Sequence, residues 1–108
     1  MKAWEIWSFQ PSGWPEPHPA VIVSHPMRVT NKPQVDIVMG STQGAQRQPK
    51  PNEVILDESD GLDRPTLFKC DLIYTVPKAE LSPRRGVVTA PRRRKMIETI
   101  IRSHDWII

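Results

Sequence analysis

Residues 69–71 (Lys-Cys-Asp) bring an ammonium and a carboxylate together at a spacing that could support chemistry. They lie within residues 66–75, the longest stretch with strand character. On one strand, Lys69 and Asp71 would project from the same face, because side chains alternate between faces. Such a pair can share a charge, transfer a proton or hold a phosphate. Cys70 would then point to the opposite, buried face, as a core residue and not a nucleophile.

Short extended segments separated by turns must position this pair. Strands are predicted at residues 3–9, 20–24, 35–39, 53–57, 66–75 and 86–88. Residues 11–19 and 40–52 carry proline, glycine and polar residues and are predicted to be loops. Twelve prolines in 108 residues disfavour long helices and favour a fold with many turns.

The end of the chain is predicted to be helical. A single helical turn is expected at residues 78–81. A longer helix would begin after Thr89, which is suited to cap it. Its apolar positions, at i, i+1, i+4 and i+5 spacing, form one stripe: Met96, Ile97, Ile100 and Ile101. We therefore expect a mainly β protein, a small antiparallel β-barrel with a C-terminal helix, in a single domain over residues 1–108.

Composition limits the possible classes of protein. The mean hydropathy is −0.46, and no apolar run approaches the ~20 residues that span a bilayer, so no membrane association is expected. The N-terminus lacks the continuous apolar core of a signal peptide. Cys70 is the only cysteine, which excludes an intrachain disulfide and fits a reducing cytosol.

The charge is mildly basic and unevenly distributed, with a net charge of +3. Basic residues gather in the C-terminal quarter: Arg84, Arg85, Arg92, Arg93, Arg94 and Lys95. Acidic residues gather in the middle: Asp57, Glu58, Asp60 and Asp63. A basic face suits a polyanionic partner, although a solvated surface would have the same composition.

Five segments, in sequence order, resemble motifs of the MazF/PemK family of bacterial toxin endoribonucleases. Residues 5–7 (Glu-Ile-Trp) and 18–24 (His-Pro-Ala-Val-Ile-Val-Ser) are similar to its first two strands. Residues 40–43 (Gly-Ser-Thr-Gln) resemble its Thr-Thr-Gln segment, and residues 61–66 (Gly-Leu-Asp-Arg-Pro-Thr) its Gly-Leu-Pro-Lys-Pro-Ser turn. Residues 69–78 resemble its Arg-Cys-Asp-Gln and Arg-Thr-Val-Asp-Lys region.

The resemblance implies an SH3-like β-barrel that is usually a homodimer and acts in the cytoplasm. It also implies a cognate antitoxin and sequence-specific cleavage of single-stranded RNA (messenger RNA) without a metal or other cofactor. The implied reaction is attack of a ribose 2′-OH on the adjacent phosphate. Such a reaction needs a base, groups that stabilise the charged transition state, and an acid for the leaving oxygen.

Four residues take catalytic roles by this resemblance: His18, Thr42, Lys69 and Asp71. His18 occupies the place of an arginine, so a permanent phosphate clamp is replaced by a group that titrates near neutrality. Asp71 matches an aspartate that acts as base, and Lys69 replaces the arginine beside it. Without the resemblance, the same residues would be read as a loop histidine and a surface ion pair.

Five further residues are expected to contact RNA: Trp14, Ser41, Gln43, Arg47 and Lys50. Ser41 and Thr42 could hydrogen-bond a phosphate or simply cap the loop. Trp14 could stack on a base or pack against the barrel. His25 and His104 lack partners at ligand-like spacing, so no metal site is predicted.

Two other functions fit the same sequence. The chain could be a barrel that binds RNA or a protein partner without cutting, since His18 and Lys69 replace arginines. It could also be a toxin of the same fold that poisons DNA gyrase.

Overall fold

Seven antiparallel strands form one hydrogen-bonded sheet, in the order β4-β5-β3-β2-β1-β7 with β6 also pairing with β3. The structure, a computed structural model, describes residues 1–106. The strands are β1 (Glu5–Phe9), β2 (His18–Ile22), β3 (Gln34–Ser41), β4 (Glu53–Leu56), β5 (Thr66–Lys69), β6 (Tyr74–Pro77) and β7 (Leu81–Val87).

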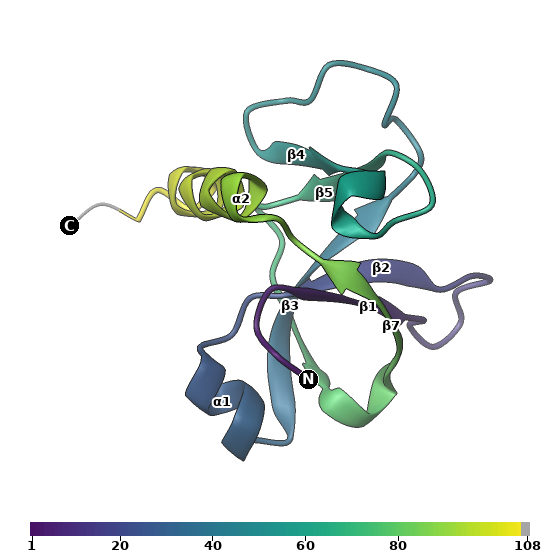
Figure 1. The fold of residues 1–108 in the computed structure, drawn as a ribbon, viewed down its shortest axis with the longest axis vertical. Coiled ribbons are helices and arrows are strands. Elements are labelled where there is room, and N and C mark those ends of the chain that lie inside the picture. The colour runs from purple at the N-terminus through teal and green to yellow at the C-terminus, as the bar shows by residue number, and fades with distance from the viewer. Residues whose placement is uncertain (107–108) are drawn as a thin grey trace.

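Two α-helices and two 3-10 turns complete the fold. The helices are α1 (Pro26–Asn31) and α2 (Ala90–Ser103), and the 3-10 turns are Glu58–Asp60 and Lys78–Glu80. Figure 1 shows α1 near the start of β3 and the β4–β5 pair near its far end. The predicted class, mainly β with a C-terminal helix, is confirmed. The sheet is open, since β4 and β7 end the strand order and do not pair with each other within the described residues.

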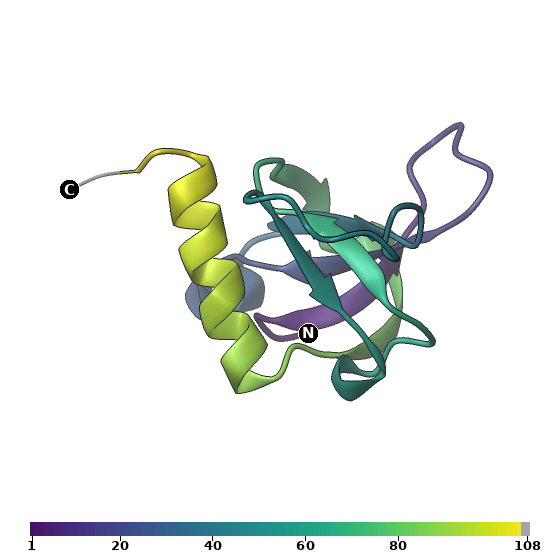
Figure 2. The same cartoon turned by 90° about the horizontal axis from the view of Figure 1, so that it is seen from above.

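The core occupies both faces of the central strands. On β2, Val21 faces one apolar cluster, whereas Ala20 and Ile22 face a second one. This alternation follows from the two-residue period of a strand. Met96 and Ile100 of α2 cover the first cluster, and Figure 2 shows α2 along one side of the sheet. Because both faces are covered, β2 reads as a continuous apolar run.

One edge of β3 is shared by two short strands, and this corrects the prediction for residues 66–75. β6 pairs with residues 34–37 of β3, and β5 pairs with Gly40 and Ser41. Between them the chain turns at residues 70–73, where the Leu72 amide donates to the Lys69 carbonyl (3.3 Å). The predicted single strand is therefore two strands, and Asp71 lies in the turn between them.

Two predicted loops are shorter than expected. β2 begins at His18, inside the predicted 11–19 loop, and β3 continues through Ser41, inside the predicted 40–52 loop. Gly40 lies within β3, and packing explains why this position is a glycine: a Cβ there would lie 2.6 Å from the Phe68 ring. No pattern in the sequence predicted α1, a six-residue helix whose Met27 amide donates to the His25 side chain (3.0 Å).

The apolar stripe of α2 is only partly buried. Met96 and Ile100 are in the core, whereas Ile97 and Ile101 are 39% and 45% exposed. Thr99, between the two buried positions, satisfies its hydroxyl by donating to the Lys95 carbonyl (2.7 Å). The face that meets the sheet is thus centred on Met96, Thr99 and Ile100. No helix within residues 1–106 is long and apolar enough to cross a membrane.

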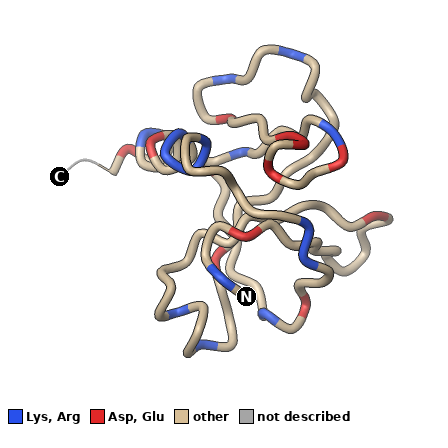
Figure 3. Tube along the Cα trace, in the orientation of Figure 1, with Lys and Arg blue, Asp and Glu red and all other residues tan. Residues whose placement is uncertain are grey.

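Many of the clustered charges are paired with one another. Arg92, in the first turn of α2, donates to Asp57 (2.6 Å) and to buried Asp60 (2.7 Å). These bonds from Arg92 lower the pKa of Asp57 to about 2. Figure 3 shows basic and acidic residues interspersed on α2, and acidic residues gathered in the segment after β4. The predicted basic face is therefore reduced, because this arginine holds α2 to the segment after β4.

Candidate functional site

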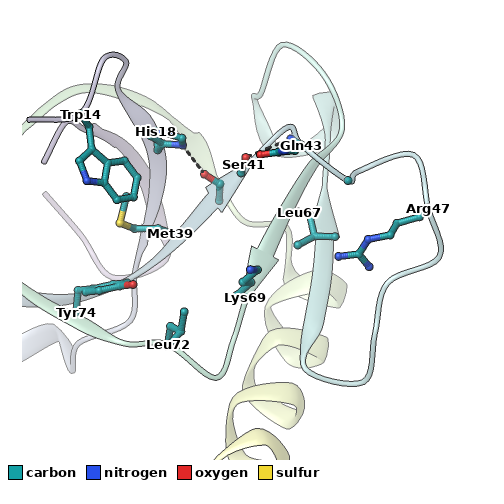
Figure 4. Close-up of a pocket in the computed structure, with 12 residues that line it drawn as sticks. Trp14, His18, Met39, Ser41, Gln43, Arg47, Leu67, Lys69, Leu72 and Tyr74 are labelled. Atoms are coloured by element: carbon teal, nitrogen blue, oxygen red, sulfur yellow. Dashed lines mark hydrogen bonds between the residues drawn. The ribbon is translucent and has the colours of Figure 1, made fainter.

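A cavity of about 510 Å³ opens where β5 and β6 separate along β3 (Figure 4). Its lining comes from the β1–β2 loop, the end of β3, the loop after β3, and the β5–β6 turn. Six of the residues predicted to act in catalysis or RNA binding line it: Trp14, His18, Ser41, Gln43, Arg47 and Lys69. Segments far apart in the sequence therefore supply one site.

His18 is held in a defined orientation at the start of β2. Its Nδ1 lies 3.2 Å from the Gly40 carbonyl oxygen, across the β2–β3 pair. A carbonyl oxygen can only accept, so this contact requires the proton on Nδ1. In the neutral ring, Nε2 then carries the lone pair that can take a proton. The contact with β3 thus orients the ring and leaves Nε2 as the nitrogen that could accept a proton.

Lys69 and Asp71 do not form the predicted pair. Lys69 is the last residue of β5 and lines the cavity, and its ammonium makes no ion pair with any residue that the structure describes. Asp71 is exposed in the following turn and does not line the cavity. It accepts a hydrogen bond from the Asn52 side chain (2.9 Å). Lys69 is thus the group available to an anion in the cavity.

The Arg47 side chain is engaged in an ion pair with Glu53. Its guanidinium donates two hydrogen bonds to the Glu53 carboxylate, at 2.7 and 2.9 Å. The Lys50 amide adds a third at 2.8 Å, although the Lys50 side chain does not line the cavity. Glu53 is 4% exposed, and the bonds from Arg47 lower its pKa to about 2. This pair fixes the loop that forms one wall of the cavity.

The loop also positions its hydroxyl and amide side chains. The Ser41 hydroxyl accepts a hydrogen bond from the backbone N–H of Gln43 (3.2 Å), in the turn that follows β3. Ser41 and Gln43 line the cavity, whereas Thr42 between them is exposed and does not. Of the two hydroxyls predicted to meet a phosphate, the structure brings only Ser41 to the cavity.

The apolar part of the lining, which includes Met39, Leu72 and Tyr74, was not predicted from the sequence. On one continuous strand, Lys69 and residue 74 would face opposite sides. The turn at residues 70–73 changes that phase, so that Lys69, Leu72 and Tyr74 meet one cavity. The only signal in the sequence was the presence of large apolar residues directly after the polar Lys-Cys-Asp motif. That signal does not indicate a shared cavity unless the turn at residues 70–73 is known.

Two other predictions concern cysteine and metal. Cys70 is fully buried, as expected for a core residue, and burial raises the pKa of its thiol to about 12. A neutral buried thiol is a poor nucleophile. Within residues 1–106, no three His, Cys, Asp or Glu side chains gather as metal ligands would.

Similar folds occur in solved structures of bacterial toxins. One is an endoribonuclease in complex with its cognate antitoxin from a mycobacterial species, with a TM-score of 0.85 and 22% identity, covering 100% of this chain and 98% of that one. Another is the Mycobacterium tuberculosis toxin MazF-mt6, with a TM-score of 0.82 and 21% identity, covering 96% and 99%. A third is MazE-MazF from Deinococcus radiodurans, with a TM-score of 0.74 and 12% identity, covering 94% and 92%. The fold is therefore that of the MazF toxins.

The sequence itself gives the family. Residues 2–103 match the model described as "PemK-like, MazF-like toxin of type II toxin-antitoxin system". A search of curated proteins finds no match. The chain belongs to the PemK/MazF-like toxin family.

Proposed function

We propose that this toxin is a metal-independent endoribonuclease that cuts single-stranded RNA in the cavity beside β3. The observation that carries the proposal is that His18, with its Nδ1 held by a backbone carbonyl, and Lys69, which makes no ion pair within residues 1–106, both line that cavity. Two of the similar structures are described as endoribonucleases, which supports the same reaction class.

The proposed reaction uses the RNA's own nucleophile. His18 Nε2 takes the proton from a ribose 2′-OH, and the 2′ oxygen attacks the adjacent phosphorus. The bond from phosphorus to the 5′ oxygen breaks, and the Lys69 ammonium gives that oxygen its proton. The products are a 2′,3′-cyclic phosphate and a 5′-hydroxyl end. Lys69 also offsets the negative charge that develops on the phosphate.

Asp71 and Thr42 receive a lesser role in this proposal than the sequence suggested. Neither lines the cavity, and the carboxylate of Asp71 accepts a hydrogen bond from the Asn52 side chain. The proton-transfer role proposed for Asp71 therefore passes to His18. Ser41 and Gln43 remain available to hydrogen-bond a phosphate, whereas Arg47 supports the wall through Glu53.

The partners follow from the family. We propose that a cognate antitoxin inhibits the protein by covering this cavity, since the family acts in toxin–antitoxin pairs and one similar structure holds such a complex. A homodimer is proposed on the same resemblance. With messenger RNA as substrate, the protein would act in the cytoplasm.

Purified protein incubated with single-stranded RNA and a chelator tests the proposal. We expect cleavage that leaves 2′,3′-cyclic phosphate ends. His18→Gln should lower the rate by about 10²–10⁴-fold, the usual contribution of general acid–base catalysis. His104→Gln, a histidine at the end of α2, is the matched control and should cut normally.

Two results would contradict this assignment. Binding of RNA without any product would make the chain the non-catalytic member considered above. Cleavage that survives His18→Gln but is lost in Asp71→Asn would return the base to Asp71.

A further inference from the structure

Lys69 lies directly opposite a carboxylate with which it forms no ion pair. In the β4–β5 pair, Glu53 is the register partner of Lys69. Side chains of opposite residues in an antiparallel pair project from the same face, with Cβ atoms about 5 Å apart. The next register pair, Val54 and Phe68, faces the apolar core on the other side, as the two-residue period of a strand requires. Glu53 therefore shares the face from which Lys69 lines the cavity.

The Glu53 carboxylate is engaged by another cation. An ammonium and a carboxylate in opposite positions ordinarily attract each other across the strands. Here the Arg47 guanidinium donates to both Glu53 oxygens, at 2.7 and 2.9 Å, and the Lys50 amide also donates to Oε1 at 2.8 Å. Figure 4 shows the Arg47 side chain extending from the loop after β3 toward the strands. Because its planar fork matches two oxygens at once, Arg47 is a better partner for this carboxylate than Lys69.

The second carboxylate close to Lys69 also has another partner. Asp71, two residues along the chain, accepts a hydrogen bond from the Asn52 side chain (2.9 Å). Asn52 is itself held in place, since its carbonyl accepts from the Cys70 amide (2.8 Å). Lys69 forms no ion pair within residues 1–106. Its ammonium is left for a ligand because both neighbouring acids are engaged elsewhere.

We propose that Arg47 keeps the Lys69 ammonium available to the RNA phosphate by occupying the Glu53 carboxylate. The inference rests on the proposed function and makes Arg47 a positioning residue, which acts through Glu53 and Lys69 and not by contact with RNA. Without the guanidinium, the Glu53 carboxylate, 4% exposed, would lack a cation, and Lys69 across the strands would replace it. A lysine held there no longer offsets the charge that develops on the phosphate.

Cleavage of single-stranded RNA by four variants tests this role. Arg47→Met should lower the rate toward that of Lys69→Gln, a loss of at least about tenfold. Adding Lys69→Gln to Arg47→Met should cause no further loss, since both changes withdraw the same ammonium from the phosphate. Arg47→Met combined with Glu53→Gln should recover most of the lost rate, because the carboxylate that captures Lys69 is gone. Circular dichroism establishes that each variant is folded.

The matched control is Arg84→Met, which removes another arginine bonded to a glutamate, Glu5 (2.9 Å), outside the cavity. It should cut RNA at the wild-type rate.

The salt dependence of RNA binding gives a second readout. The probe is a single-stranded RNA with 2′-fluoro riboses throughout, which lacks the attacking hydroxyl and is not cut. Arg47→Met should reduce the slope of log affinity against log salt by about 0.7, the value for one phosphate contact, as Lys69→Gln does. Adding Glu53→Gln to Arg47→Met should restore the slope.

Three results would overturn the inference. One is a folded Arg47→Met variant that cuts at the wild-type rate. Another is a loss from Arg47→Met that adds fully to the loss from Lys69→Gln, as a merely structural role of Arg47 would give. The third is a folded Arg47→Met, Glu53→Gln variant that stays slow, which would place Arg47 on the RNA itself.

Two further outcomes keep the test decisive. If Arg47→Met alone does not fold, the variant that also carries Glu53→Gln decides by its rate, since recovery supports the inference and a persistent loss overturns it. Failure of the proposed function is a separate result, seen as wild-type protein that does not cut RNA. In that case the salt slopes with the 2′-fluoro RNA decide the role of Arg47.

Discussion

Removing the guanidinium of Arg47 should destabilise the protein because it leaves a buried carboxylate nearly unpaired. Glu53 accepts three hydrogen bonds, two from Arg47 and one from the Lys50 amide. The Glu53 side chain is 2% exposed, so water cannot readily replace the lost donors. In Arg47→Met, only the Lys50 amide would remain.

The size of the effect follows from the burial of the two partners. Breaking a buried ion pair by removing one partner costs about 3–5 kcal/mol. The Arg47 side chain is 41% exposed, which allows some water to enter, so we expect about 2–3 kcal/mol. For a protein of this length, that loss lowers the melting temperature by roughly 10 °C.

Urea denaturation of a double-variant cycle measures the pair directly. Replacing both partners, as Arg47→Met with Glu53→Leu, should recover most of the stability, because no charge is then left buried. The pH dependence gives a second measure. The bonds from Arg47 hold the pKa of Glu53 near 2, below its usual 4.5. This contribution is therefore complete above about pH 5 and lost as the pH falls toward 2.

Two outcomes would refute the reasoning. One is an Arg47→Met variant as stable as the wild type at pH 7. The other is a double variant that is less stable than Arg47→Met alone. If Arg47 acts mainly on RNA, as the sequence suggested, Arg47→Met would lose RNA binding while keeping its full stability.

Three further predictions concern the cavity and the core. Lys69→Gln should lower the rate of RNA cleavage by at least about tenfold, since it removes a charge that stabilises the transition state. Lys50→Gln, outside the cavity, should leave the rate unchanged, and equal rates for the two variants would contradict the role of Lys69. Gly86→Ala should lower the urea midpoint sharply, because the new Cβ would collide with the Asp60 carbonyl oxygen, and an unchanged midpoint would contradict this close packing. Burial raises the pKa of Cys70 to about 12, so a thiol reagent at pH 8 should label it only after denaturation, and rapid labelling of the folded protein would oppose its place in the core.

Local patterns were sufficient for much of the fold. The short apolar runs predicted most of the strands, and the spacing of Met96 and Ile100 predicted the side of α2 that packs on the sheet. Such patterns depend on side-chain periodicity, which a strand or helix imposes wherever one face is buried. The order of motifs predicted the family, which the match over residues 2–103 confirmed.

The make-up of the cavity depended on tertiary structure. No glycine or proline marks the turn at residues 70–73, which forms because β5 and β6 must share one edge of β3. That turn moves Asp71 out of line with Lys69 and brings Leu72 and Tyr74 into the cavity. Likewise, the Arg47–Glu53 pair forms across a loop whose path local sequence does not specify. Which side chains meet is decided by the pairing of strands distant in sequence, whereas periodicity describes only one strand at a time.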